Sequence, residues 1–201
     1  RTCVPPEITK AIALRTTSGS SMLQDDLSHE IVAVDIEDCI RMNADCMASQ
    51  VFIGGDGQLS SIDNLSQIIN AGMRYSIPTL GVCAVGKDME RTDRFFKLAT
   101  RIIAEMGVQI VKTYDCENFE EVVAACPVPI VVAGGKKLPE KDALHLAYDV
   151  IRKGAHGVDM GRNIFQSPHP IEMAQAIRMI VHQKATDEEA FELYTDAIHT
   201  K

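Results

Sequence analysis

The sequence predicts an α/β protein, specifically a (β/α)₈ TIM barrel supplied without its N-terminal βα portion. Short β-branched runs alternate with longer amphipathic runs along the whole chain, which is typical of repeated βα units and a parallel sheet. The dinucleotide fingerprint GxGxxG is absent, and about six or seven βα units in series exceed what an open flavodoxin-like sheet usually carries. A full barrel takes roughly 250 residues. Because the 201 residues open on Arg1 and reach a strand pattern almost at once, we expect that an N-terminal portion is missing.

The expected elements follow from β-branched runs for strands and from apolar residues at helical spacing for helices. The strands are expected at residues 11–15, 45–53, 79–85, 108–113, 129–133 and 157–160, with a weaker candidate at 31–34. The helices are expected at 37–43, 61–72, 94–107, 118–125, 140–154 and 171–182. Thr186 and Glu189 form a potential capping box for a final helix over 187–198, so residues 186–201 are expected to be an outer C-terminal helix.

Composition places the chain among single-domain proteins that fold without a metal or a disulfide. Hydrophobic residues make up 46% of the chain, enough to bury a sizeable core, so residues 1–201 are expected to form one domain. None of the six cysteines forms a CxxC pair or sits at metal-finger spacing, which predicts no metal site and reduced thiols of a cytoplasmic protein. The net charge of −8 argues against a nucleic-acid surface, and no apolar run is long enough to cross a membrane.

Lys112 is the leading candidate for a catalytic nucleophile. It lies near the end of the expected strand 108–113 and shares the side-chain parity of Val108 and Ile110. On a barrel strand this parity can point the side chain inward, at the carboxyl end where loops build active sites. Burial disfavours a charged ammonium, and the neutral amine can attack a ketone to form a Schiff base. A lysine that extends from the strand end into solvent is the alternative.

Two glycine-containing loops follow the next two expected strands. The first is Gly134-Gly-Lys-Lys137, and the second contains Gly161 and Arg162. In barrels, phosphate sites are commonly made by the loops after strands seven and eight, where glycines let backbone N–H groups approach an anion. Arg162 can add a bidentate contact to phosphate oxygens. We therefore predict a phosphate site that includes Lys136, although Lys136 and Lys137 can also be solvated, or can supply the Schiff-base lysine instead.

Three runs in the second half carry a family resemblance. They are Ile110-Val-Lys-Thr-Tyr114, Cys126-Pro-Val-Pro-Ile-Val-Val-Ala-Gly-Gly-Lys-Lys-Leu-Pro-Glu140 and Gly157-Val-Asp-Met-Gly-Arg-Asn-Ile-Phe-Gln-Ser167. On these runs the sequence resembles the DeoC/archaeal-type class I aldolase family, and within it the Lsr-type thiolase branch that cleaves phosphorylated autoinducer-2, a quorum-sensing signal. The likeness extends over essentially the whole chain.

The resemblance implies a TIM barrel in which Lys112 forms the Schiff base and Gly134, Gly135, Gly161 and Arg162 hold the substrate phosphate. It implies transfer of an acetyl group from 3-hydroxy-5-phosphonooxypentane-2,4-dione to coenzyme A, with release of dihydroxyacetone phosphate. Coenzyme A is then a co-substrate, and no bound cofactor is expected. The family's ring-like assemblies imply a homo-oligomer, often a decamer. Tyr114 is a candidate for proton transfer.

Two departures from the family pattern bear on the reaction. Aldolases of this family carry an aromatic acid near the end of the strand that matches residues 79–85, whereas this sequence has Cys83-Ala-Val-Gly-Lys87, which favours the thiolase branch. The family's N-terminal strand with its Asp-His pair is not in this sequence. Two alternatives stay open: a class I aldolase that acts on a ketose phosphate without coenzyme A, and a non-catalytic phosphate-sugar-binding barrel fragment. Gly86-Lys-Asp88 is a further candidate substrate contact.

Overall fold

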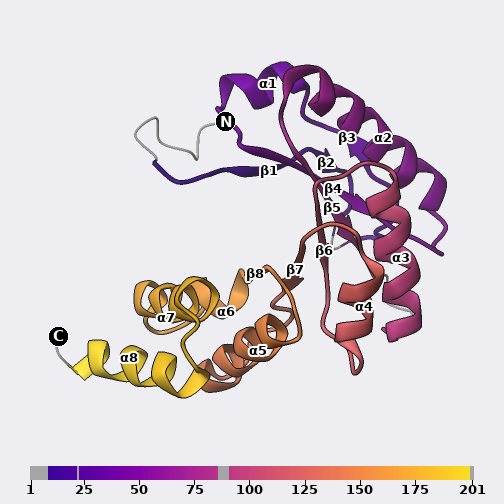
Figure 1. Cartoon of the computed structure of the whole chain (residues 1–201). Coiled ribbons are helices and arrows are strands. Elements are labelled where there is room, and N and C mark those ends of the chain that lie inside the picture. The colour runs from indigo at the N-terminus through magenta and orange to yellow at the C-terminus, as the bar shows by residue number, and fades with distance from the viewer. Residues whose placement is uncertain (1–8, 22, 86–90, 200–201) are drawn as a thin grey trace. The chain divides into compact units, whose positions relative to one another are not determined.

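The computed structural model describes residues 9–21, 23–85 and 91–199, and Figure 1 shows its helices and strands in chain order. The candidate contact Gly86-Lys-Asp88 lies outside the described residues. The chain divides into two compact units, residues 1–91 with 98–111 and residues 92–97 with 112–201. The division runs through one helix, α3 (Asp93–Glu105), and one strand, β6 (Ile110–Thr113). The expectation of a single domain over 1–201 stays a prediction.

The first unit is built on parallel strands in the order β1-β4-β5-β6. Strand β1 (Ala13–Arg15) pairs with β4 (Cys46–Val51), which pairs in turn with β5 (Thr79–Cys83). Helices α1 (Ile36–Arg41) and α2 (Gln58–Tyr75) lie along these strands in Figure 1. Each helix connects two neighbouring parallel strands, which is the βαβ arrangement that the alternating sequence pattern predicts.

Side-chain alternation decides which face of the first unit's sheet is covered by helices. Met47 on β4 packs in an apolar cluster with Cys39 of α1 and Ile68 of α2, so this face of the strand is buried under the helices. At the next strand, a Cβ atom on Gly81 would lie 2.2 Å from Cγ2 of Ile103 on α3. Only glycine lets this helix approach β5 so closely, and the glycine therefore sets the distance between the two layers.

The weaker strand candidate at 31–34 is confirmed as a strand over its first two residues, and its partner is a strand that the sequence did not predict. The structure has β3 (Ile31–Val32) paired antiparallel with β2 (Thr17–Ser18) in a separate two-stranded sheet. After it, the N–H groups of Ala33 and Val34 both donate to the carbonyl of Thr16, at 2.8 and 3.2 Å. The segment between β1 and α1 thus folds back on itself. The β-branched pattern identified a strand but could not specify its partner.

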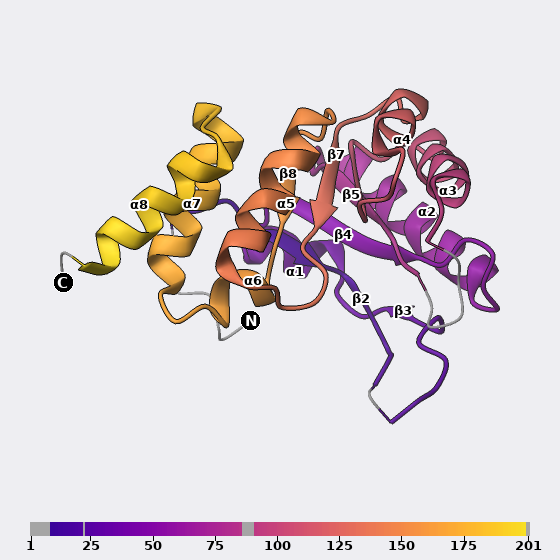
Figure 2. The same ribbon diagram turned by 90° about the horizontal axis from the view of Figure 1, so that it is seen from below.

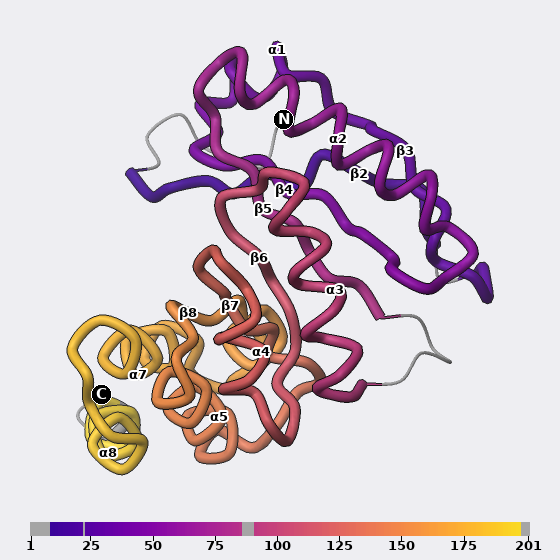
Figure 3. The backbone as a smooth tube through the Cα atoms, turned by 45° about the vertical axis from the view of Figure 1, so that its right-hand side comes forward, coloured from indigo at the N-terminus to yellow at the C-terminus, as the bar shows by residue number. Residues whose placement is uncertain are grey.

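The second unit contains the end of β6 followed by β7 (Ile130–Ala133) and β8 (Gly157–Asp159), in the order β6-β7-β8. Strands β7 and β8 are parallel and lie side by side in Figure 3. Helix α4 (Phe119–Ala125) connects β6 to β7, and α5 (Glu140–Arg152) connects β7 to β8. The one-turn helix α6 (Arg162–Phe165) follows β8 and was not predicted, because a single turn has no measurable periodicity.

Three helices of the second unit pack together around one apolar cluster, as Figure 2 shows for α5, α7 (Pro170–Gln183) and α8 (Asp187–His199). Leu144, Met173 and Tyr194 are among its buried members. The predicted capping box is confirmed: the Thr186 N–H donates to Glu189 at 2.8 Å, and the Glu189 N–H donates to the Thr186 hydroxyl at 3.2 Å. Within residues 9–21, 23–85 and 91–199, no helix has the length and apolar character of a membrane span.

Candidate active site

Lys112 lies on the carboxyl-terminal half of β6. Its neighbours Val111 and Thr113 are fully buried, while Lys112 and Ile110 share the other face of the strand and are partly exposed. The Lys112 side chain keeps 24% of its surface accessible, and its Nζ lies 2.8 Å from Oδ2 of Asp159. The amine is therefore recessed, yet a small molecule can reach it. It is neither enclosed in the core nor extended freely into solvent.

Asp159 ends β8, two strands away from Lys112 in the order β6-β7-β8. Between them, Ala133 of β7 is in register with Asp159. Register partners in a parallel pair point to the same face, so the side chain that β7 presents beside Asp159 is only a methyl group. The lysine can reach across it to the carboxylate. Sequence analysis did not select Asp159, although its place at the end of an expected strand, like that of Lys112, could have indicated it.

The two predicted phosphate loops lie together because the glycine of one packs against the other. A Cβ atom on Gly134 would lie 2.7 Å from Cγ of Met160 and 3.0 Å from Nδ2 of Asn163. The Gly134 N–H also donates to the carbonyl oxygen of Asp159 at 3.2 Å. Any larger residue at position 134 would separate the loop after β7 from the loop after β8.

Asn163 fixes the two loops to each other through its side-chain amide. This residue is fully buried in the first turn of α6. Its Nδ2 donates to the carbonyl of Gly134 at 2.8 Å, and its Oδ1 accepts from the N–H of Leu138 at 2.8 Å. Sequence analysis missed this role, because a hydrogen bond between residues so far apart in the chain leaves no local pattern.

The remaining predicted phosphate contacts surround this junction. Gly135 has a φ of +65°, and an added Cβ there would meet nothing within 4 Å, so space for a ligand adjoins its backbone. Gly161 immediately precedes α6, and Arg162 is its first residue; both are exposed. Lys136 is exposed as well. The second unit thus gathers the predicted glycines with two cations, an arrangement suited to a small anion.

Lys137 does not serve the phosphate site, because its amine binds other groups. Its Nζ donates to Oε1 of Glu140 at 2.6 Å and to the carbonyl of Leu138 at 2.8 Å. The hydrogen bond from Lys137 to the Glu140 carboxylate lowers the pKa of Glu140 below its ordinary value. Of the two adjacent lysines, Lys136 is therefore the one available to a ligand.

Tyr114 follows β6 directly and is half-buried. Its ring packs near that of Phe96 on α3, with centroids 6.2 Å apart. The role of Tyr114 in proton transfer stays a prediction. Burial, with Asp115 and Asp93 adding to it, raises the pKa of the nearby Cys116 thiol to about 11, which disfavours its nucleophilic thiolate form at neutral pH.

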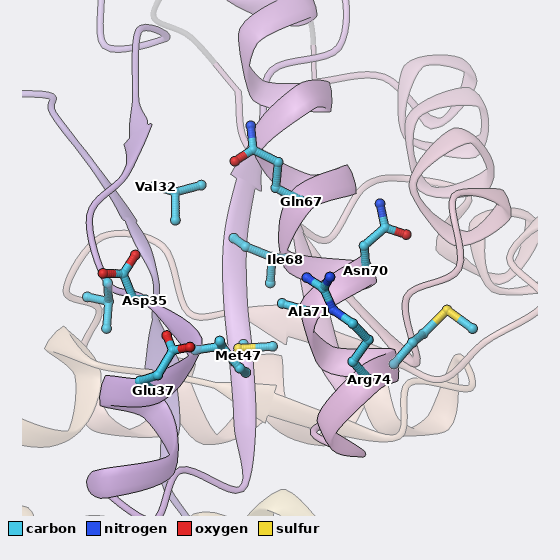
Figure 4. A pocket seen from close by; sticks show the side chains of 12 residues that line it. Val32, Asp35, Glu37, Met47, Gln67, Ile68, Asn70, Ala71 and Arg74 are labelled. Carbon is cyan, nitrogen blue, oxygen red and sulfur yellow. The ribbon is translucent and has the colours of Figure 1, made fainter.

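A separate cavity of about 710 Å³ lies in the first unit, between α1, α2 and the strands beneath them (Figure 4). Its floor is apolar, with Met47 and Ile68, and its rim carries Asp35, Glu37 and Arg74. None of the residues that line it was predicted to act on substrate. It belongs to a different unit from Lys112 and the two glycine loops.

Comparison with known proteins identifies the family. The family model described as DeoC/LacD family aldolase matches residues 9–167, which is most of the chain. The chain belongs to the DeoC/LacD aldolase family. The predicted resemblance is thereby confirmed, and the protein is an enzyme of an aldolase family rather than an unrelated barrel.

Curated members of the aldolase family resemble the chain over nearly all its length. It is 52% identical over 197 residues to an uncharacterized aldolase of Pasteurella multocida (strain Pm70), covering 98% of this chain and 68% of that protein. It is 51% identical over 195 residues to the 3-hydroxy-5-phosphonooxypentane-2,4-dione thiolase of Escherichia coli (strain K12), covering 96% of this chain and 67% of that one. The chain thus spans about two thirds of these relatives.

Solved aldolase structures share the fold. An archaeal fructose 1,6-bisphosphate aldolase superposes with a TM-score of 0.79 at 22% identity, over 86% of this chain and 71% of that one. A fructose-bisphosphate aldolase from Slackia heliotrinireducens gives a TM-score of 0.82 at 18% identity, over 94% and 67%. At this identity the likeness concerns the fold alone, and it confirms the predicted α/β fold class of an incomplete aldolase barrel.

Proposed function

We propose that the protein is a Schiff-base-forming thiolase, an acyltransferase of the aldolase family. In this proposal Lys112 forms an imine with 3-hydroxy-5-phosphonooxypentane-2,4-dione, whose acetyl group passes to coenzyme A while dihydroxyacetone phosphate is released. The substrate is the one named by relatives that are 51% identical across 96% of the chain. The observation that carries the proposal is the recessed amine of Lys112 in the same unit as two joined glycine loops.

The chemistry follows from a lysine imine at the ketone next to the phosphate-bearing carbon. The Lys112 amine adds to that carbonyl, one proton is taken up and water leaves, which produces a positively charged imine. Coenzyme A thiolate attacks the acetyl carbonyl, and the carbon–carbon bond to the hydroxyl-bearing carbon breaks. The bonding electrons move into the imine to form an enamine. Protonation at carbon and hydrolysis then release dihydroxyacetone phosphate and restore the free lysine.

The glycine loops position the substrate by binding its phosphate. Gly134 lets the two loops approach each other, Gly135 and Gly161 offer backbone N–H groups to the phosphate of the substrate, and Lys136 and Arg162 offer positive charge. Holding the phosphate fixes how far the ketone lies from the amine, and such orientation is worth several kcal/mol of barrier in general. Asn163 keeps the two loops together, so the phosphate meets both at once.

The test is to incubate the protein with the phosphorylated diketone, with and without coenzyme A, and to measure acetyl-coenzyme A and dihydroxyacetone phosphate. We expect both products in equal amounts only when coenzyme A is present, and neither from the Lys112→Met variant. Failure of wild-type protein to form acetyl-coenzyme A would contradict the thiolase proposal.

An aldolase without coenzyme A is the second candidate, favoured by the family description and by the fold shared with fructose-bisphosphate aldolases. It predicts cleavage or synthesis of a ketose phosphate at a rate that coenzyme A does not change.

Two further properties belong to the proposal. We place the enzyme in the cytoplasm, where thiols stay reduced, and the free cysteines among the described residues support this: Cys39, Cys46, Cys83, Cys116 and Cys126. The homo-oligomer implied by the family resemblance also stays a prediction, and sedimentation velocity would measure it.

A further inference from the structure

The carboxylate of Asp159 is the polar group that meets the Lys112 amine. The distance from Nζ to Oδ2 is 2.8 Å, so the two side chains form a direct ion pair. Of the two side chains, Asp159 is the more open, with 52% of its surface accessible against 24% for Lys112. A ketone that approaches the amine therefore approaches this carboxylate as well.

Stability gives little reason for a carboxylate at this position. Ion pairs that are this exposed contribute about 0–1 kcal/mol. The backbone of Asp159 is nevertheless held firmly: it is in register with Ala133 on β7, and its carbonyl accepts the N–H of Gly134 at 3.2 Å. The same residue therefore meets the candidate nucleophile through its side chain and the candidate phosphate loop through its main chain.

We infer that Asp159 is a catalytic residue, the group that moves protons to and from Lys112 and the bound ketone. The role rests on the proposed function, because it requires an imine at Lys112. Tyr114, the candidate selected from the sequence for proton transfer, packs near Phe96. Asp159 is in direct contact with the reacting nitrogen, and geometry is the first requirement for an acid–base group.

The proton balance is complete with these two side chains and the substrate. The Asp159 carboxylate takes one proton from the Lys112 ammonium and leaves a neutral amine. The amine adds to the carbonyl carbon, and one of its protons moves to the former carbonyl oxygen, which gives a neutral carbinolamine. The Asp159 carboxyl then donates its proton to that hydroxyl, the carbon–oxygen bond breaks and water leaves. The products are a positive imine and a negative Asp159 carboxylate, so the pair ends with the charges it had at the start.

The experiment measures imine formation and not turnover, with dihydroxyacetone phosphate as the probe. The protein is mixed with it, quenched with borohydride at increasing times, and the reduced adduct on Lys112 is quantified by peptide mass spectrometry. The variants are Asp159→Asn, which keeps the shape, Asp159→Glu, which keeps the carboxylate, and Asp159→Ala with and without added formate. Asp142→Asn is the matched control, since it neutralises an exposed carboxylate on α5 of the same unit. Thermal unfolding of each variant is measured alongside.

We expect Asp159→Asn to slow the maximal rate of adduct formation on the order of 100-fold, the usual contribution of a positioned acid–base group. The half-saturating probe concentration should stay within about threefold of the wild-type value, because the phosphate loops are intact. Glutamate should restore part of the rate, and formate should accelerate the alanine variant, which a merely structural role would not produce. Asp142→Asn should react at the wild-type rate.

Two outcomes overturn the inference, and they are distinguishable. If wild-type protein forms the Lys112 adduct and Asp159→Asn forms it at a similar rate, the role of Asp159 is wrong while the proposed function stands. If wild-type protein forms no adduct on Lys112, both fail together.

Discussion

Asn163 offers the sharpest test of how the fold holds the candidate phosphate loops. Replacing it with alanine removes a donor to the carbonyl of Gly134 and an acceptor from the N–H of Leu138, both at 2.8 Å. Since Asn163 is fully buried, water cannot freely replace these bonds. Two hydrogen bonds at about 1 kcal/mol each, plus partial desolvation of the groups left behind, give a loss of about 3 kcal/mol.

For a chain of this length, a loss of that size lowers the unfolding midpoint by roughly 6–12 °C. Circular dichroism melts and urea titrations at fixed pH measure it. Gln166→Ala is the matched control: it removes an exposed amide just after α6 and should change stability by less than about 0.5 kcal/mol. Asn163→Asp should also destabilise, because it keeps the acceptor for Leu138 but sets a carboxylate against the carbonyl of Gly134. If Asn163→Ala melts within about 1 °C of wild type, the assignment of Asn163 as the joint between the loops is refuted.

Two other predictions concern the second unit. The hydrogen bond that His145 donates to the Asp187 carboxylate raises the pKa of His145. The stabilisation from this bond is therefore present below the ordinary histidine pKa and is lost as the pH rises through the raised value. His145→Asn should lower the melting midpoint near pH 6 by only about 1–2 °C, because solvent screens the pair, and it should not change the midpoint near pH 9. Equal effects at the two pH values would contradict this prediction. Gly134→Ala should cost about 1–3 kcal/mol in urea unfolding, since its Cβ would lie 2.7 Å from Cγ of Met160. Gly135→Ala has open space for its Cβ but a φ of +65°, so it should cost only about 1 kcal/mol of backbone strain. A larger loss of stability at position 135 than at position 134 would contradict this explanation.

Much of the fold could be predicted because its signals are local. The run Val108 to Thr113 alternates in the way that places Lys112 on one face, and β6 has that burial pattern. The capping box of Thr186 and Glu189 was likewise readable, because its two hydrogen bonds join residues three positions apart. The pairing of strands was harder to predict from the sequence, and the segment at 31–34 shows why. β-Branched residues favour an extended chain without specifying which strand it pairs with.

The candidate site was predictable in its parts and not in its connections. Glycines and cations at strand ends could be read directly, since barrels place their functional loops there. Asp159 and Asn163 were missed because their importance lies in contacts with Lys112 and Gly134, which are distant in sequence. Position at a strand end could have selected Asp159. Nothing local distinguishes Asn163 from any other polar residue at the start of a short helix.

Borohydride reduction in the presence of dihydroxyacetone phosphate, followed by peptide mapping of the modified chain, shows whether Lys112 is the lysine that binds the ketone covalently. We expect one covalent adduct per chain, on Nζ of Lys112, and no adduct in Lys112→Met protein that melts like wild type. An adduct on Lys136 or Lys137, or no adduct at all, would contradict it.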